Sequence, residues 1–185
     1  MIARRYGRAP RRTYVTGISN GGHLTRWQLE HHPELYDGGV DREGTLWTAD
    51  GPDLDAACDY AARPDAVRRA VARVSLTGRI GKPLITLQGD LDTLLPIAAD
   101  SDVYTRMIRE QGHGGLHRSY RIEDGTHVDG LYDSHPARLR PMLPCYRAAF
   151  DALVARVERG HRPPADRTVS RPASGDVVDS CSLRP

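Results

Sequence analysis

The sequence predicts an α/β fold in which a layer of parallel strands is covered by helices on both faces. Apolar or β-branched residues at 14–16 and 83–87 indicate strands, and a segment with helical spacing follows each of them. Strands that alternate with helices are typical of βαβ units and parallel sheets. A length of 185 residues and an apolar fraction of 39% allow one domain with a modest core.

The first strand runs into a tight turn with a serine at its centre. Residues 17–21 read Gly-Ile-Ser-Asn-Gly, the G-x-S-x-G pattern, and a helix is expected at 23–32, stopped by Pro33. A serine in this pattern holds its hydroxyl clear of the backbone, and both glycines are expected to relieve crowding between strand and helix. A plain surface turn is the alternative, but the order of strand, turn and helix favours Ser19 as a nucleophile.

The turn predicts a carboxylate and then a histidine further along the chain. The strand at 83–87 leads into a turn with two aspartates. Asp92 is the favoured acid because G-x-x-D followed by an apolar residue and proline is the usual arrangement, and Asp90 is the fallback. A further strand is expected at 118–122, and the loop after it contains His127.

These residues have defined roles in acyl transfer through a serine ester. His127 would take the proton of Ser19 and return it to the leaving group. Asp92 would hold the imidazole in the correct tautomer, and the backbone N–H of Asn20 would stabilise the oxyanion. This chemistry requires no metal or organic cofactor, and the expected ligand is a small ester.

Residues 44–82 lie where this class of fold inserts a lid. The best helix in this insertion is expected at 64–74, which begins at a proline and has an apolar stripe, and 45–60 reads as loop with a short helix. Trp47 and His23 are candidates to face the substrate. The alternatives are lid packing for Trp47 and, for His23, a position that does not line the site.

Two further helices are expected at 97–111 and 146–159. We place a partial catalytic domain at residues 1–160. Proline, arginine, serine and aspartate dominate residues 161–185, which predicts a disordered tail.

The cysteines are odd in number and widely spaced, so neither a metal site nor a disulfide framework is expected. Cys145 is expected to be a small buried residue. Most other histidines are expected to be solvated. The cysteines are Cys58, Cys145 and Cys181, and these histidines are His31, His32, His113, His117, His135 and His161.

The segments 6–43 and 83–130 resemble the tannase and feruloyl esterase group of α/β-hydrolases. They share its Y-G-x-x-P lead-in, its G-x-S-x-G-G turn and its P-x-x-Y-D-G segment. The resemblance implies hydrolysis of phenolic or hydroxy-acid esters, with the triad on the three residues above. Tannase-type members have bridged cysteines where this chain has Ile18 and Val128, which we expect to pack together. Hydrolases of 3-hydroxybutyrate oligomers therefore fit as well.

Only a short stretch, Met1 to Arg12, leads up to the first strand, whereas the resemblance implies several strands and an oxyanion loop before it. The chain is therefore expected to be the C-terminal part of such a fold, with an unpaired edge open to self-association. A serine peptidase of the prolyl-oligopeptidase type is the enzymatic alternative. A non-catalytic remnant or interaction module is the alternative from another class.

The formal net charge of +2 gives no reason to expect nucleic acid as a partner. The basic start is not followed by an apolar run, so no signal peptide is expected in this chain. No stretch is long enough to predict a membrane span. These observations leave the localisation open, with the cytoplasm expected for a genuine start and secretion for a longer chain.

Overall fold

A computed structural model describes residues 2–48, 60–172 and 175–184. These residues form a five-stranded, fully parallel sheet whose strands lie in chain order, from β1 at one edge to β5 at the other. The elements are α1 (Ile2–Tyr6), β1 (Tyr14–Ile18), α2 (Asn20–His31), η1 (Pro33–Leu35), β2 (Gly38–Arg42), α4 (Asp65–Val74), β3 (Leu84–Gly89), α5 (Ser101–Glu110), η2 (Gly114–Leu116), β4 (His117–Ile122), η3 (Asp129–Leu131), α6 (Leu143–Arg159) and β5 (Arg167–Val169).

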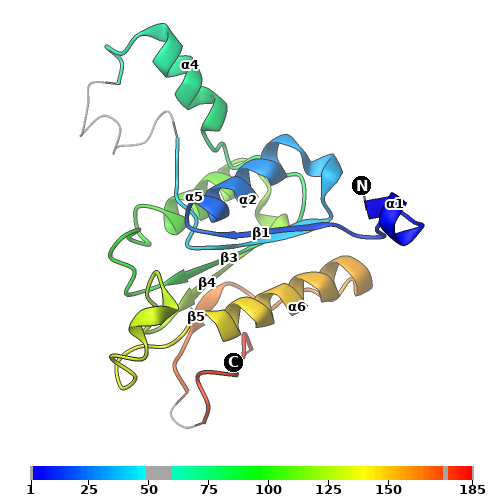
Figure 1. Ribbon diagram of the computed structural model, residues 1–185. Coiled ribbons are helices and arrows are strands. Elements are labelled where there is room, and N and C mark those ends of the chain that lie inside the picture. Colours follow the sequence, from blue (N-terminus) through cyan, green and yellow to red (C-terminus); the bar gives the residue numbers. More distant parts are fainter. Residues whose placement is uncertain (1, 49–59, 173–174, 185) are drawn as a thin grey trace.

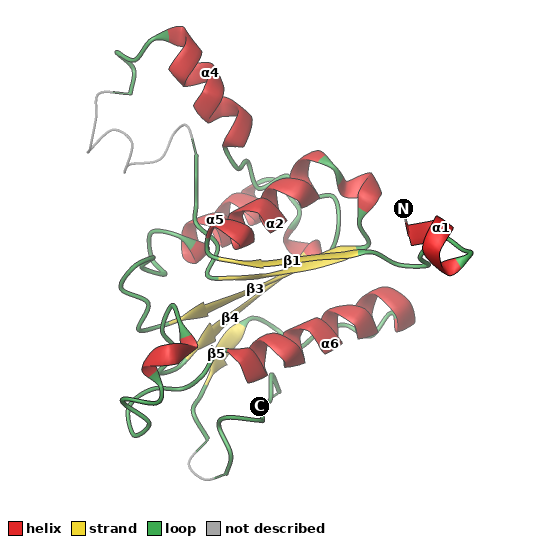
Figure 2. Cartoon of the chain, viewed as in Figure 1, coloured by secondary structure: helices red, strands yellow, loops and turns green. Residues whose placement is uncertain are grey.

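Helices cover both faces of the sheet, as predicted. Helices α2 and α5 lie on one face and α6 lies on the other (Figures 1 and 2). Successive side chains of a strand point to opposite faces. In β3, Leu84 joins the core cluster that contains Leu29 of α2, while Ile85 joins the cluster that contains Leu153 of α6. A strand buried on both faces explains the continuous apolar run in this part of the sequence.

The predicted strands coincide with β1, β3 and β4, and the predicted helices with α2, α4, α5 and α6. Element ends differ by a few residues. Helix α5 begins at Ser101 rather than at residue 97, because the N–H groups of Ala99 and Asp100 first close a turn onto the carbonyl of Pro96.

Strand β2 lies inside the sheet, between β1 and β3, but has no sequence signal of a strand. Its sequence, Gly-Gly-Val-Asp-Arg, contains two glycines and two charged residues, yet every residue is buried. A Cβ on Gly38 would lie 3.0 Å from the Leu153 side chain, and one on Gly39 would lie 2.9 Å from that of Leu29. The glycines therefore let helices of both layers approach the sheet closely.

The expected disorder of residues 161–185 is not found in the described part of that segment. Strand β5 pairs in parallel with β4, and a disulfide joins Cys145 of α6 to Cys181. The side chain of Leu183 is buried in the α6 cluster. Strand β5 has only three residues in a polar segment, too few to show the alternation that predicts a strand. Two cysteines 36 positions apart form no spacing pattern that predicts a disulfide. The expectation that no disulfide forms was therefore wrong.

Within the insertion at 44–82, helix α4 stands away from the sheet, at the top of Figure 1. None of its residues is buried. Most of the expected loop at 45–60 lies outside the described residues. Among the residues that are described, no helix has the length and apolar character needed to cross a bilayer.

Candidate active site

Ser19 is the single residue between β1 and α2. Its φ of 57° and ψ of −124° lie in a region that non-glycine residues rarely adopt. Three backbone hydrogen bonds fix the turn. Ser19 N–H donates to the carbonyl of Arg42 at 3.0 Å, and Ser19 C=O accepts from the N–H groups of His23 and Thr45 at 3.0 and 3.3 Å. The hydroxyl does not cap α2. The G-x-S-x-G pattern thus forms the expected strand-to-helix turn.

The glycines of this turn are not equivalent. A Cβ on Gly17 would collide with the backbone carbonyl of Gly21, and a Cβ on Gly22 would lie 2.6 Å from the Cα of Gly44. A Cβ on Gly21 would meet nothing within 4 Å. The expectation that both glycines of the motif relieve crowding holds for Gly17 and is wrong for Gly21.

Asp92 and His127 come together on the loops that follow β3 and β4. Asp92 Oδ2 lies 2.8 Å from His127 Nδ1, and Asp92 is only 5% exposed. Its Oδ1 accepts from the N–H groups of Leu94 and Leu95 at 3.0 and 2.9 Å, and Gln88 Nε2 donates to Oδ2 at 3.2 Å. An ionised carboxylate only accepts, so Nδ1 carries the proton and Nε2 is the basic nitrogen.

Asp90, the fallback acid, points elsewhere. It is exposed, and its Oδ1 accepts from the backbone N–H of Asp124 at 2.8 Å. Partial burial raises the pKa of Asp90, with further contributions from the charges of Asp124 and Glu123. The geometry therefore favours Asp92 as the partner of His127.

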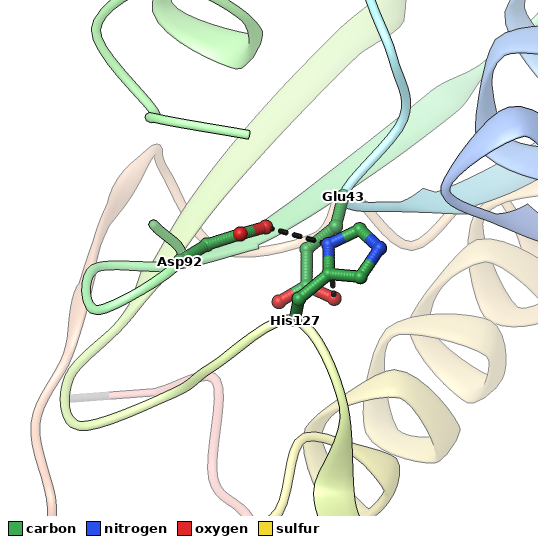
Figure 3. Close-up of side chains that lie close together, drawn as sticks. All are labelled: Glu43, Asp92 and His127. Carbon is green, nitrogen blue, oxygen red and sulfur yellow. Dashed lines mark hydrogen bonds and ion pairs between the residues drawn. The ribbon is translucent and has the colours of Figure 1, made fainter. Parts of the chain in front are cut away.

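A second carboxyl group, Glu43, faces the same imidazole (Figure 3). Glu43 follows β2 directly, is completely buried, and has a φ of 50°. Its Oε2 lies 4.0 Å from His127 Nδ1 and accepts from Arg42 Nε at 3.2 Å. Burial raises the pKa of Glu43 to about 8, the Asp92 charge adds to this, and Arg42 opposes it. Sequence reasoning missed Glu43 because β2 was not predicted.

Arg42 connects this carboxyl group to the histidine loop. Its Nη2 donates to the carbonyl of His127 at 3.3 Å and to Asp129 Oδ1 at 2.7 Å. Asp129 in turn accepts from the N–H groups of Met142 and Leu143 at the start of α6. The His127 loop is therefore attached both to the end of β2 and to α6.

In the described part of the chain, Glu43, Asp92 and His127 are the one group of three potential ligand side chains within 4.8 Å of one another. Asp92 and the imidazole are hydrogen-bonded to each other, and Glu43 is paired with Arg42. We therefore assign no metal to this group.

A buried chain of hydrogen bonds runs from Asp92 into the core and reaches His117. The expectation that His117 is solvated was wrong, since it is 2% exposed and burial lowers its pKa to about 3. The chain links, in order, Asp92, Gln88, Ser101, Arg26, Asp41, Thr86 and His117. Asp92 is thus held by the packed interior rather than by its loop alone.

An apolar cleft of about 510 Å³ opens between α2 and α4, beside the serine turn. It contains both expected substrate-facing residues, with Trp47 46% exposed and His23 6% exposed. The His23 ring nitrogen Nδ1 lies 3.3 Å from the carbonyl of Thr45, and burial lowers its pKa. The lining residues are Asn20, His23, Leu24, Trp47, Ala70, Val71 and Val74.

The expected packing of Ile18 against Val128 is not found as a buried pair. The two side chains are 43% and 49% exposed. The hydrogen bonds of Arg42, rather than apolar packing, connect the serine turn to the histidine loop.

Ser19, Asp92 and His127 follow β1, β3 and β4, so all three lie at the carboxyl edge of the sheet. This parallel sheet, with a serine on a strained strand-to-helix turn, defines an α/β-hydrolase. Acylaminoacyl peptidase from Pyrococcus horikoshii has the same fold, with a TM-score of 0.58 and 17% identity over 89% of this chain and 27% of the other. An esterase from Pyrococcus furiosus matches with a TM-score of 0.53 and 16% identity, covering 84% and 57%.

The sequence places the chain in one family of this class. Residues 36–182 match the 3HB-oligomer hydrolase (3HBOH) family, and the chain belongs to it. A D-(-)-3-hydroxybutyrate oligomer hydrolase from Polaromonas naphthalenivorans (strain CJ2) is 28% identical over 132 residues, which is 68% of this chain. The chain spans 19% of that relative's length. The predicted α/β-hydrolase fold is therefore confirmed.

Proposed function

We propose that this chain carries the acyl-transfer site of a serine-dependent carboxylic-ester hydrolase, with Ser19, His127 and Asp92 as its triad. The observation that carries the proposal is the 2.8 Å hydrogen bond between buried Asp92 and His127 Nδ1. The strained turn that presents Ser19 at the same edge of the sheet supports it. Membership of a family of oligomer hydrolases agrees with this reaction class.

In the proposed reaction, Ser19 Oγ attacks the ester carbonyl while His127 Nε2 takes the hydroxyl proton. The carbon–oxygen bond to the alcohol then breaks, and His127 returns the proton to the leaving alcohol. Water attacks the acyl-enzyme in the same way, releasing the acid and restoring Ser19. Asp92 keeps the proton on Nδ1 and stabilises the imidazolium in both steps.

The oxyanion needs hydrogen-bond donors at the start of α2. Asn20 is the first residue of that helix, so its N–H has no acceptor within the helix. This donor and the positive end of the helix dipole would stabilise the negative oxygen. Loss of one such donor typically costs about 2.7–4 kcal/mol of transition-state stabilisation.

Oligomers of 3-hydroxybutyrate are the substrate class we favour. The relative from Polaromonas naphthalenivorans is named for such a substrate. The cleft beside Asn20 is lined mainly by aliphatic side chains, which suit short methyl-branched acyl units. We propose that the insertion at 44–82 acts as a lid over this cleft. Phenolic esters are the second candidate, since Trp47 could stack on an aromatic acid and the sequence resembles tannases and feruloyl esterases.

The test is hydrolysis of a 3-hydroxybutyrate trimer, methyl ferulate and an acylated dipeptide by the purified chain and by Ser19→Ala. We expect the trimer to have the highest kcat/KM and Ser19→Ala to lose turnover of every ester. Faster cleavage of the dipeptide would favour the peptidase alternative. Ester turnover that survives Ser19→Ala would contradict the proposal.

A further inference from the structure

We propose that Glu43 is a second carboxyl group that positions and stabilises the imidazole of His127, acting beside Asp92. This inference rests on the proposed function, because a role for the imidazole presupposes that His127 is the base. Glu43 would not touch the substrate, so we describe it as a positioning residue.

The geometry behind the proposal is the convergence of two buried carboxyl groups on one ring nitrogen. Asp92 Oδ2 lies 2.8 Å and Glu43 Oε2 lies 4.0 Å from His127 Nδ1. Figure 3 shows that the two groups reach the ring from different segments of the chain. Asp92 makes the hydrogen bond, and Glu43 contributes at the distance of an ion pair.

The backbone holds Glu43 in this position at some energetic cost. Its φ of 50° is rare for a side chain of this size, and its N–H donates to the carbonyl of Leu87 at 2.8 Å. Glu43 Oε1 is buried with no hydrogen bond of ordinary geometry among the described residues, although a backbone contact with Gly89 lowers the pKa of the carboxyl group. Strained backbone and unpaired buried polar atoms are features that cluster at functional sites.

The charged groups around Glu43 come from three elements. Arg42 at the end of β2 pairs with it, Asp92 after β3 repels its negative charge, and His127 after β4 faces it. Asp129 lies on the far side of the Arg42 guanidinium. Arg42 is thus shared between the carboxyl groups of Glu43 and Asp129. Its positive charge therefore does not fully balance a negative charge on Glu43 beside the imidazole.

The role of Glu43 in the reaction follows from where the proton of Ser19 goes. When the proton of Ser19 moves to His127 Nε2, the imidazole becomes a cation with both nitrogens protonated. Asp92 stabilises this cation by its hydrogen bond, and Glu43 adds a second negative charge above its pKa of about 8, where it is ionised. No proton leaves either carboxyl group in this step. Glu43 and His127 should therefore titrate as a coupled pair.

The first test is an NMR titration of the His127 ring nitrogens in the full chain. Burial raises the pKa of Glu43 to about 8, so the His127 signals of the parent chain should follow two steps, one of them near that pH. Glu43→Gln should remove the step near pH 8, because the glutamine amide does not titrate. Glu110→Gln, at the exposed end of α5, should match the parent chain.

The second test is a double-mutant cycle read as the rate of Ser19 labelling by a fluorophosphonate above the Glu43 pKa of about 8, where Glu43 is ionised. If the two carboxyl groups substitute for each other, Glu43→Gln should slow labelling at least about fivefold more in the Asp92→Asn background than in the parent background. A purely structural role would slow labelling by the same factor in both. Equal factors, or a single-step titration of His127 in the parent chain, would overturn the proposal.

The two readouts separate this inference from the proposed function. Absence of Ser19 labelling in the parent chain would contradict the proposed function, while the titration would still report whether Glu43 couples to His127. If circular dichroism shows that Glu43→Gln does not fold, the titration of the parent chain alone tests the proposal. A single step in that titration would show that Glu43 and His127 are not coupled.

Discussion

At the scale of single residues, Ser19 holds backbone strain at the point where the proposed reaction occurs. Its φ of 57° costs a non-glycine residue on the order of 1–3 kcal/mol. Its backbone N–H donates to the carbonyl of Arg42 and its carbonyl accepts from His23 N–H, and these hydrogen bonds hold the conformation. The hydroxyl does not cap its own helix, and Ser19 lies after β1, at the carboxyl edge of the sheet.

The two aspartates after β3 should respond differently to removal of charge. Asp92→Asn should lower kcat for the preferred ester by at least about 100-fold, because the amide favours the wrong imidazole tautomer. Asp90→Asn should change kcat less than about threefold, since Asp90 bonds to the backbone of Asp124 rather than to the ring. Steady-state kinetics of both variants would check this, and equal losses would remove the assignment of Asp92.

His117 should make stability depend on pH in the acid range. Its folded-state pKa of about 3 lies below the ordinary value of 6.5, so its full stabilising contribution is present above pH 6.5. As the pH falls from 6.5 toward 3, the unfolded chain takes up a proton that the folded chain does not. The free energy of unfolding should therefore fall by up to about 1.4 kcal/mol per pH unit from this group.

His117→Gln retains a donor for the Thr86 hydroxyl but does not titrate. Its free energy of unfolding, measured by urea denaturation, should fall less steeply on acidification than that of the parent chain. Parallel curves for the two proteins between about pH 6.5 and 4 would show that the burial of His117 has no such effect.

The site residues that could be predicted are those that lie beside a clear local sequence pattern. Ser19 is marked by flanking glycines, and Asp92 and His127 each follow an apolar strand. Glu43 follows a strand too, but that strand begins with two glycines and ends with two charged residues, so the position after it carries no signal. Glu43 could have been found only from the rule that acidic residues at the carboxyl edge of a parallel sheet converge.

At the scale of elements, the serine turn depends on close approach between the end of β1 and the first turn of α2. Gly17→Ala should destabilise the fold by about 1–3 kcal/mol, because its Cβ collides with the Gly21 carbonyl. Gly21→Ala should be neutral or stabilise by up to about 1 kcal/mol, because its Cβ enters open space within a helix.

Chemical denaturation of the two variants tests this contrast within one motif. The turn has the described geometry only if Gly17→Ala is the less stable protein. Equal stability of the two alanine variants would contradict the packing assigned to the turn.

Long-range pairing explains the elements that the sequence did not predict. Strand β2 lies between two strands and under helices on both faces, so its glycines are set by neighbours distant in sequence. Strand β5 has three residues and pairs with β4, and the segment after it is joined to α6 by the disulfide between Cys145 and Cys181. The pattern of apolar residues within one segment does not reveal its contacts with segments that are distant in sequence.

At the scale of the whole molecule, the described sheet has an open side. Strand β1 pairs only with β2 among the described strands, and Thr16 and Ile18 on it are exposed. An unpaired strand is a template for pairing with another chain. We propose that the isolated chain associates through this edge.

Sedimentation velocity at increasing concentration tests the association. The parent chain should form dimers or larger species, and Thr16→Lys should reduce them because a charge on an edge strand disfavours pairing. Thr168→Lys, on the opposite edge strand β5, is the matched control and should leave association unchanged. A parent chain that stays monomeric throughout would contradict the proposal.

The central claim is that Ser19 is activated by His127 and Asp92 in this chain, and labelling by a fluorophosphonate followed by intact-mass measurement tests it most directly. The account predicts one adduct on the folded parent chain, and none on Ser19→Ala or His127→Ala. No adduct on well-folded protein would mean that the triad is not assembled, as expected of a non-catalytic remnant or one part of a larger enzyme. That result would contradict the account.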